Sequence, residues 1–167
     1  MSDADLFALA AAVGARLQAS RQSLVTAESC TGGLIAGAVT AIAGSSDWFE
    51  RGMVTYSNEA KQEMLGVRQA TLDAFGAVSE ATAREMAEGA LRASRASISV
   101  AVTGVAGPGG GSREKPVGMV CFGWSRRGGT TEVETVHFAG DRTAVREATV
   151  RHALHGILAR LDGNLPA

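Results

Sequence analysis

The sequence predicts a three-layer α/β/α sandwich built on a mixed β-sheet, and three observations lead to this fold class. Short apolar strand patterns alternate with amphipathic helical patterns along the first 104 residues. The run SISVAVTG, residues 97–104, is almost wholly apolar, which is typical of a strand covered on both faces. Two later strand patterns are joined by RRGGT, which indicates an antiparallel hairpin with a glycine turn. The sheet should therefore contain both parallel and antiparallel strands.

The helical patterns share apolar residues at spacings of three and four, and polar residues mark where several of them begin. We expect helices within 3–21, 31–44, 59–65, 80–91 and 142–161, with Asn58, Ser79 and Asp141 as N-caps of the last three. The strand patterns cover 23–27, 53–57, 97–104, 118–125 and 131–139. The turn ESCTGG connects the first strand to the second helix.

Length and composition narrow the class of protein. At 167 residues, the chain is expected to form one domain over 1–167. Sixteen Lys and Arg balance seventeen Asp and Glu without any run of like charge, which argues against a nucleic-acid partner. No apolar stretch suits a secretory signal or a membrane span, so we expect a cytoplasmic protein with no membrane partner. Two cysteines without CxxC spacing predict reduced thiols and no structural zinc.

Ser29 is the candidate nucleophile, because it stands where a strand leads into a glycine-rich helix start. Backbone N–H groups and the positive end of the helix dipole face such a position. The N–H groups around Thr31, Gly32 and Gly33 would hold the oxyanion of a tetrahedral intermediate. The alternative is that Ser29 or Thr31 merely caps the helix, and the local pattern alone favours this alternative. The chain has no GxSxG nucleophile elbow.

Lys61 is the candidate base, since none of the three histidines offers an obvious one. If Asn58 is the N-cap, Lys61 is the third helical residue, where the helix dipole disfavours an ammonium ion. Burial would act in the same direction, so both effects would lower the pKa of the amine. Tyr56 ends the preceding strand and would orient Lys61 or relay a proton. The alternatives are a solvated lysine and a packed tyrosine ring, and each is the more probable when taken alone.

The glycine-rich loop 104–118 should line a binding site, because it has too few core residues for a simple connection. Thr103 and Gly104 follow a buried strand and would lie at the sheet edge where open α/β folds bind ligands. Arg142, at the start of the last helix, would contribute a guanidinium to a phosphate site. The loop matches neither a phosphate P-loop nor GxGxxG. The alternative is a flexible surface loop and a solvated arginine.

Two long stretches carry a resemblance to a known family. They are TAESCTGGLIAGAVTAIAGSSDWFERGMVTYSNEAKQEMLGV, residues 26–67, and AVTGVAGPGGGSREKPVGMV, residues 101–120. Together they resemble the C-terminal domain family of the competence/damage-inducible protein CinA, over essentially the whole chain. Stand-alone members of that family are nicotinamide mononucleotide deamidases. The resemblance therefore implies hydrolysis of nicotinamide mononucleotide to nicotinic acid mononucleotide and ammonia, without a metal or an organic cofactor, by a protein that is a homodimer.

The resemblance also implies roles for individual residues: Ser29 as nucleophile, Lys61 as base, Tyr56 as their helper, and Ser46, Thr103, Gly104 and Arg142 in the substrate pocket. Two alternatives stay open. One is a non-catalytic ligand-binding or interaction domain acting in competence or DNA-damage responses, against which the intact Ser29, Tyr56 and Lys61 argue. The other makes Cys30 the nucleophile, because its thiol lies beside Ser29 at the same helix end; here the resemblance favours serine.

Overall fold

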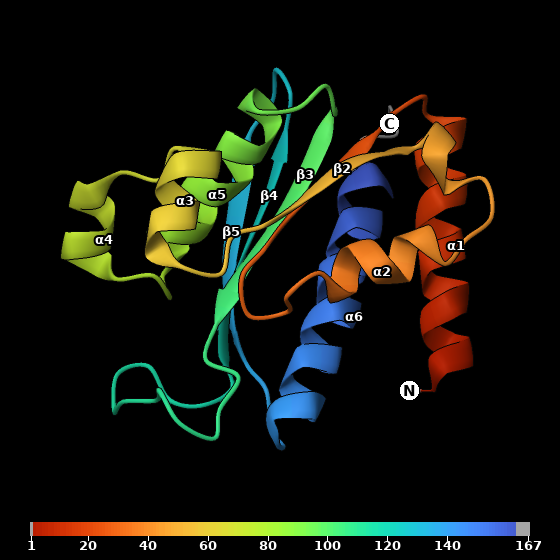
Figure 1. Ribbon diagram of the computed structural model, residues 1–167. Helices are drawn as coiled ribbons and strands as arrows, with labels where there is room; N and C mark the ends of the chain where they lie inside the picture. Colours follow the sequence, from red (N-terminus) through yellow and green to blue (C-terminus); the bar gives the residue numbers. More distant parts are fainter. Residues whose placement is uncertain (1, 163–167) are drawn as a thin grey trace.

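A five-stranded mixed sheet forms the centre of the molecule, with helices on both of its faces (Figure 1). The computed structural model describes residues 2–162. The strands lie in the order β2-β1-β3-β4-β5. The first three of these are mutually parallel, whereas β3, β4 and β5 pair antiparallel. The predicted three-layer arrangement on a mixed sheet is confirmed, and so is the hairpin.

The element bounds follow the sequence patterns closely for most of the chain. The strands are β1 Leu24–Glu28, β2 Phe49–Val54, β3 Ile98–Gly104, β4 Met119–Arg126 and β5 Thr131–His137. The helices are α1 Asp3–Ala19, α2 Leu34–Thr40, the 3-10 helix η1 Ser45–Asp47, α3 Asn58–Leu65, α4 Gln69–Phe75, α5 Glu80–Arg92 and α6 Arg142–Asp162.

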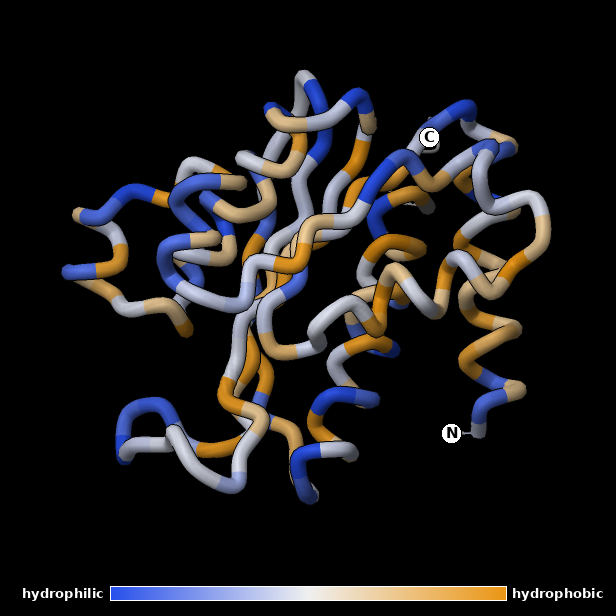
Figure 2. Tube along the Cα trace, viewed as in Figure 1, coloured by the Kyte–Doolittle hydropathy of each residue, from blue (hydrophilic) through white to orange (hydrophobic). Residues whose placement is uncertain are grey.

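Each face of the sheet has its own hydrophobic core. Helices α1, α2 and α6 cover one face and enclose the larger core, which contains the aromatic residues Trp48, Phe122 and Trp124. Helices α3, α4 and α5 cover the other face and enclose the smaller core, which is rich in alanine. Figure 2 shows the apolar segments concentrated where the helices meet the sheet. Burial of these two surfaces is the main force that holds the layers together.

Three local details differ from the sequence predictions. The N-cap of α3 is Ser57, whose hydroxyl accepts from the Ala60 N–H at 3.0 Å, so the prediction of Asn58 was wrong and Lys61 is the fourth helical residue. Strand β2 covers 49–54 rather than 53–57, because this edge strand is largely exposed and lacks an apolar pattern. Helix α4 and η1 were not predicted, since neither is long enough to show a helical period.

The other two predicted N-caps are confirmed. The Ser79 hydroxyl accepts from the Thr82 N–H at 3.1 Å, and a carboxylate oxygen of Asp141 accepts from the Ala144 N–H at 2.9 Å. Within residues 2–162 there is no helix with the length and apolar character needed to cross a bilayer.

The topology brings distant segments to one edge of the sheet. Parallel strands β1, β2 and β3 end at the same edge, so the chain after Glu28, Val54 and Gly104 converges there. The loop 105–118 and the start of α6 extend to the same end of the molecule (Figure 1). Ligands of open α/β sheets bind at this edge.

Candidate active site

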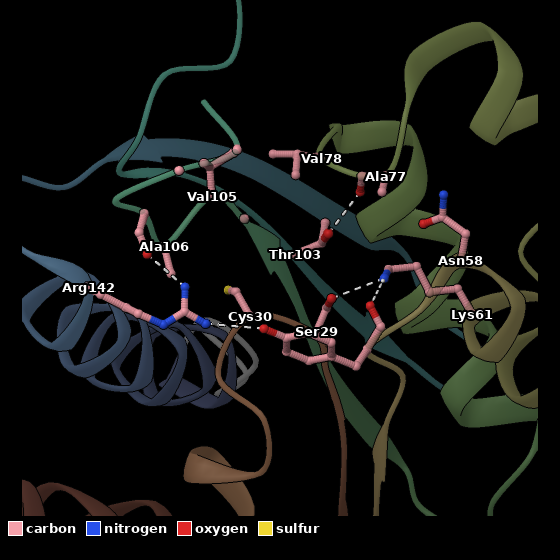
Figure 3. A pocket seen from close by; sticks show the side chains of 15 residues that line it. Ser29, Cys30, Asn58, Lys61, Ala77, Val78, Thr103, Val105, Ala106 and Arg142 are labelled. Atoms are coloured by element: carbon pink, nitrogen blue, oxygen red, sulfur yellow. Dashed lines mark hydrogen bonds between the residues drawn. The ribbon is translucent and has the colours of Figure 1, made fainter. Parts of the chain in front are cut away.

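A cavity of about 290 Å³ opens at the carboxyl ends of β1 and β3 (Figure 3). Its volume is close to the lower end of the ~300–1,000 Å³ typical of small-molecule sites. It brings together six of the ten residues predicted for the site. The lining residues are Ser29, Cys30, Tyr56, Asn58, Lys61, Ala77, Val78, Thr103, Gly104, Val105, Ala106, Gly107, Gly109, Gly110 and Arg142.

Ser29 and Lys61 face each other inside this cavity (Figure 3). Ser29 follows β1 directly, and strand alternation directs its side chain to the face of the sheet where Ala27 packs in the smaller core. Lys61 approaches from α3 on that same face. Its Nζ lies 3.0 Å from the Ser29 Oγ, and the two residues are only 2% and 8% exposed. The hydroxyl and the amine are therefore within proton-transfer distance.

The surroundings of Lys61 favour a neutral amine. Burial lowers the pKa of Lys61, and no carboxylate within residues 2–162 forms an ion pair with it. Besides Ser29, its Nζ contacts the backbone carbonyls of Thr55 at 3.1 Å and Tyr56 at 3.2 Å. Carbonyl oxygens only accept, so they take both N–H bonds of a neutral amine. Nζ also donates to the Ser29 Oγ in the structure; once the amine is neutral and its two N–H bonds go to the carbonyls, its lone pair can accept the Ser29 proton.

Tyr56 reaches Lys61 through its backbone carbonyl, whereas its ring takes another direction. The side chain is 61% exposed, and its phenol oxygen accepts from Nη2 of Arg142 at 3.1 Å. Nη1 of Arg142 donates to the Gly107 carbonyl at 2.7 Å. Arg142 therefore links the end of β2, the glycine-rich loop and α6 at the mouth of the cavity. The phenol forms no hydrogen bond with Lys61.

The predicted oxyanion donors at the α2 start are already engaged or lie outside the cavity. The Gly32 N–H donates to the Ser29 carbonyl at 3.1 Å. The Thr31 hydroxyl donates to Glu28 at 2.6 Å, and Thr31 is fully buried. Neither of these residues nor Gly33 lines the cavity. The structure thus does not bring Thr31, Gly32 and Gly33 to the substrate side of Ser29.

Glu28 explains why the positive end of α2 is unavailable. Its carboxylate is 1% exposed and accepts from the N–H groups of Ile35 at 2.8 Å and Ala36 at 3.0 Å. A negative charge at these amides satisfies both the free donors and the helix dipole. The amides of Cys30, Ala106 and Gly107 lie in residues of the cavity wall and have no hydrogen-bond acceptor among residues 2–162, and the Cys30 amide directly follows Ser29.

The Cys30 side chain lines the same cavity as Ser29 and Lys61. It also packs in the larger core, where it is 6% exposed. Burial raises the pKa of Cys30 to about 12, so the reactive thiolate is scarce at neutral pH. Both findings argue against Cys30 as the nucleophile.

Ser46 lies at the other end of the sheet. It is exposed in η1, which precedes β2 and lies beside the amino end of β1, where the Leu24 N–H donates to the Trp48 carbonyl. The five residues of β1 separate this end from Ser29, roughly 16 Å at the usual strand rise. The cavity of this chain therefore does not include Ser46.

The sequence profile of the CinA C-terminal domain matches residues 6–161. This chain belongs to the CinA C-terminal domain family. It is 53% identical over 154 residues to the nicotinamide-nucleotide amidohydrolase PncC of Escherichia coli K12, covering 92% of this chain and 93% of that protein. It is 54% identical over 146 residues to the PncC protein of Enterobacter agglomerans, covering 87% and 89% of the two chains.

Solved structures of CinA proteins share the fold. The competence/damage-inducible protein CihA of Agrobacterium tumefaciens aligns with a TM-score of 0.92 at 50% identity, covering 97% of each chain. A CinA superfamily protein of Escherichia coli aligns with a TM-score of 0.89 at 40% identity, covering 96% of this chain and 93% of that one. With such similarity to curated amidohydrolases along almost the whole chain, this CinA family member is an amidohydrolase enzyme.

The positions of some cavity-lining residues of this CinA family member could not be predicted from the sequence. Ala77 and Val78 enter the wall because the α4–α5 connection folds over the cavity, and the Thr103 hydroxyl fixes that connection by donating to the Ala77 carbonyl at 2.8 Å. Asn58 was considered only as a cap. Glu28 did carry a signal, since a carboxylate that ends a wholly buried strand must find partners. Within residues 2–162, no three His, Cys, Asp or Glu side chains gather as a metal site.

Proposed function

We propose that this enzyme hydrolyses the carboxamide of nicotinamide mononucleotide, giving nicotinic acid mononucleotide and ammonia, with Ser29 as nucleophile and Lys61 as base. One observation carries the chemistry: a buried lysine amine 3.0 Å from a serine hydroxyl, with its other contacts made only to carbonyl oxygens. The names of the PncC relatives support the substrate.

The reaction begins when the neutral amine of Lys61 takes the Ser29 proton while Oγ attacks the carboxamide carbon. The carbonyl oxygen becomes an oxyanion, and the N–H of Cys30 is the donor best placed to stabilise it, together with the amides of Ala106 and Gly107. Lys61, now an ammonium group, gives its proton to the amide nitrogen. The C–N bond breaks, ammonia leaves, and the acyl group remains on Ser29 as an ester.

The second half returns the enzyme to its starting state. Lys61 takes a proton from a water molecule, which attacks the acyl carbon and forms a second tetrahedral intermediate. This intermediate releases the carboxylic acid while Lys61 returns the proton to the Ser29 Oγ. Throughout, the carbonyls of Thr55 and Tyr56 hold the amine in place.

Arg142 is the group proposed for the substrate phosphate. Its guanidinium lines the cavity and contacts only a phenol and a backbone carbonyl, and no carboxylate within residues 2–162 pairs with it. A phosphate oxygen would supply the missing negative charge through charge-assisted hydrogen bonds. Thr103 and Gly104, at the end of β3, would line the side of the cavity next to Ser29.

The test is an ammonia-release assay with purified protein and nicotinamide mononucleotide, with the pyridine product identified by mass spectrometry. We expect equal amounts of ammonia and nicotinic acid mononucleotide, and no release by the Ser29→Ala protein. Ligand binding without ammonia release by the wild-type protein would refute the proposal and favour a non-catalytic binding domain. Trapping of an acylated Ser29 peptide would identify the nucleophile directly.

A further inference from the structure

The turn of residues 29–33, which presents Ser29, is held by a guanidinium from α6. Arg146, in the second turn of α6, donates from Nε to the Cys30 carbonyl at 3.1 Å and from Nη2 to the Thr31 carbonyl at 3.2 Å. Arg146 does not line the cavity. Any effect of this side chain on the reaction must therefore pass through the backbone of the turn.

The hydrogen bonds of the turn form a continuous series that leads back to the proposed oxyanion donor. A peptide unit is planar and trans, so its C=O and its N–H point in opposite directions. Arg146 fixes the Thr31 carbonyl, and thereby the orientation of the N–H of the next residue, Gly32. That N–H donates to the Ser29 carbonyl at 3.1 Å. The Ser29 carbonyl in turn fixes the direction of the N–H on the far side of the same peptide, which belongs to Cys30.

The Thr31 carbonyl also accepts from the Leu34 N–H at 3.1 Å, so the peptide planes of the turn depend on Arg146 most strongly at the Cys30 carbonyl. Residues 29–33 are neither helix nor strand, and Gly32 and Gly33 have positive φ angles of 58° and 107°, where other backbone conformations are readily accessible to glycine. Glu28 holds the Thr31 hydroxyl and the first amides of α2, but it forms no bond with the Cys30 carbonyl. Only Arg146 contacts that carbonyl among the described residues.

We infer that Arg146 is a positioning residue for catalysis: its guanidinium holds the Cys30 and Thr31 carbonyls so that Ser29 and the Cys30 N–H keep the geometry needed for attack and for oxyanion binding. This inference rests on the proposed role of Ser29 as the nucleophile. Arg142 lies one helical turn before Arg146 on the same helix, so the start of α6 supports both the cavity mouth and the Ser29 turn.

Loss of the Arg146 guanidinium should lower kcat and leave substrate binding nearly unchanged. A displacement of about 1 Å at the reacting atoms costs on the order of 100-fold in rate, so we expect kcat of Arg146→Gln to fall by roughly 10- to 100-fold. KM should change by no more than about twofold, because the cavity wall is intact. The acid limb of the pH profile should stay where it is, since Lys61 keeps all its contacts. Arg146→Lys should also lose activity, because one ammonium group reproduces the two-pronged contact poorly.

Arg160 offers a matched control on the same helix. It also packs its guanidinium against the protein, 3.8 Å from the centre of the Trp124 ring, and donates to the Gly156 carbonyl at 3.0 Å. It lies 14 residues further along α6, roughly 21 Å from Arg146 at the usual helical rise. Arg160→Gln should lower the melting temperature while leaving kcat unchanged. Equal loss of kcat in the two variants would show that Arg146 acts only through general stability and would overturn the inference.

Chemical rescue by guanidinium ion tests the same role of Arg146. Arg146→Ala should regain kcat when guanidinium ion is supplied at concentrations that do not unfold the protein, whereas Arg160→Ala should not. The inference is refuted if folded Arg146→Gln keeps its kcat and guanidinium ion does not raise the kcat of Arg146→Ala. If Arg146→Gln does not fold, Arg146→Lys takes its place in all comparisons.

The rate at which a fluorophosphonate labels Ser29, followed by intact mass, separates this inference from the proposed substrate. Slower labelling of the Arg146 variant would support the inference even if the wild-type protein did not deamidate nicotinamide mononucleotide. Labelling at the wild-type rate would contradict it, whatever the substrate.

Discussion

The two faces of the sheet are built differently, and the difference separates stability from chemistry. The larger core, under α1, α2 and α6, contains the stacked rings of Phe122 and Trp124, with centroids 5.4 Å apart. The smaller core, under α3, α4 and α5, consists mostly of alanine, methionine and leucine. Buried polar residues on this second face include Lys61 and Thr103. Large apolar side chains contribute most to folding, so we assign most of the stability to the larger core.

Small residues on the face of the smaller core bring its helices close to the sheet and to each other. A Cβ on Gly123 would lie 2.5 Å from the Ala83 carbonyl oxygen, so β4 and α5 are in backbone contact. A Cβ on Gly89 would lie 1.8 Å from the Leu65 carbonyl oxygen, so α5 also contacts the end of α3. This close packing fixes α3, and with it the position of Lys61, relative to the end of β1. The close packing on this face therefore contributes more to the geometry of the site than to the free energy of unfolding.

The largest effect is expected from replacing Ser29, with a substitution of the neighbouring Cys30 as its control. Ser29→Ala should reduce kcat by at least ~10,000-fold, because it removes the nucleophile of a unit whose members act together. Cys30→Ala should keep kcat within about tenfold, since its thiol packs in the larger core, and should cost about 1 kcal/mol of stability. Ammonia release and thermal unfolding of both proteins provide the measurement. A Cys30→Ala protein that folds but has no activity would contradict the assignment.

Trp124→Ala probes the larger core. Trp124 is 1% exposed and donates from its ring nitrogen to the Ala153 carbonyl at 3.2 Å. Its truncation should lower the free energy of unfolding by about 3–5 kcal/mol. Activity per folded molecule should change by less than about threefold, because Trp124 has no contact with the cavity. Urea unfolding and kcat at low temperature measure the two quantities, and Trp124→Phe serves as a milder control. A large fall in kcat of the folded protein would show that the two faces are coupled.

The sequence predicted the fold well because its helices and strands carry clear hydrophobic periods, whereas the site depended on contacts between distant segments. The proximity of Lys61 to Ser29 comes from α3 packing on α5, which in turn packs against β1, and no local pattern reports these contacts. The residues at the α2 start do not line the cavity, and there is a physical reason for this. A free helix end was assumed to face the substrate, but Glu28, one residue before Ser29, occupies it. The cavity wall at Ala77 likewise depends on tertiary structure, through its bond with Thr103.

Lys61→Arg tests whether the Lys61 amine acts as a base. Burial lowers the pKa of Lys61, which must be neutral to accept the Ser29 proton. As the pH falls through that pKa, the amine becomes protonated, so kcat/KM of the wild-type enzyme should fall on the acid side and rise with pH. A guanidinium does not deprotonate in proteins, so Lys61→Arg should lose at least ~100-fold in kcat/KM and should lack this acid limb.

The control for this prediction is a fold measurement, because a larger side chain at a buried position also disturbs packing. Lys61→Met, which is closer in shape to the buried stem, should be equally inactive. If folded Lys61→Arg protein turns over at a near-normal rate, the proton goes to another group, and Tyr56 or a histidine becomes the next candidate.

Arg142→Gln should have the smallest effect, and this effect should depend on the ligand. Arg142 lies at the mouth of the cavity, where its guanidinium contacts only the Tyr56 phenol and the Gly107 carbonyl. A hydrogen bond to a charged group contributes about 1.5–3 kcal/mol, so loss of the phosphate contact should raise KM for nicotinamide mononucleotide by roughly 10- to 100-fold. KM for nicotinamide riboside, which lacks the phosphate, should hardly change. Equal losses for the two ligands would mean that Arg142 holds the Tyr56 ring and the Gly107 loop in place rather than binding phosphate. In that case raising the salt concentration, which screens an exposed charge pair, should leave wild-type KM unchanged, whereas a phosphate contact predicts that KM increases with salt.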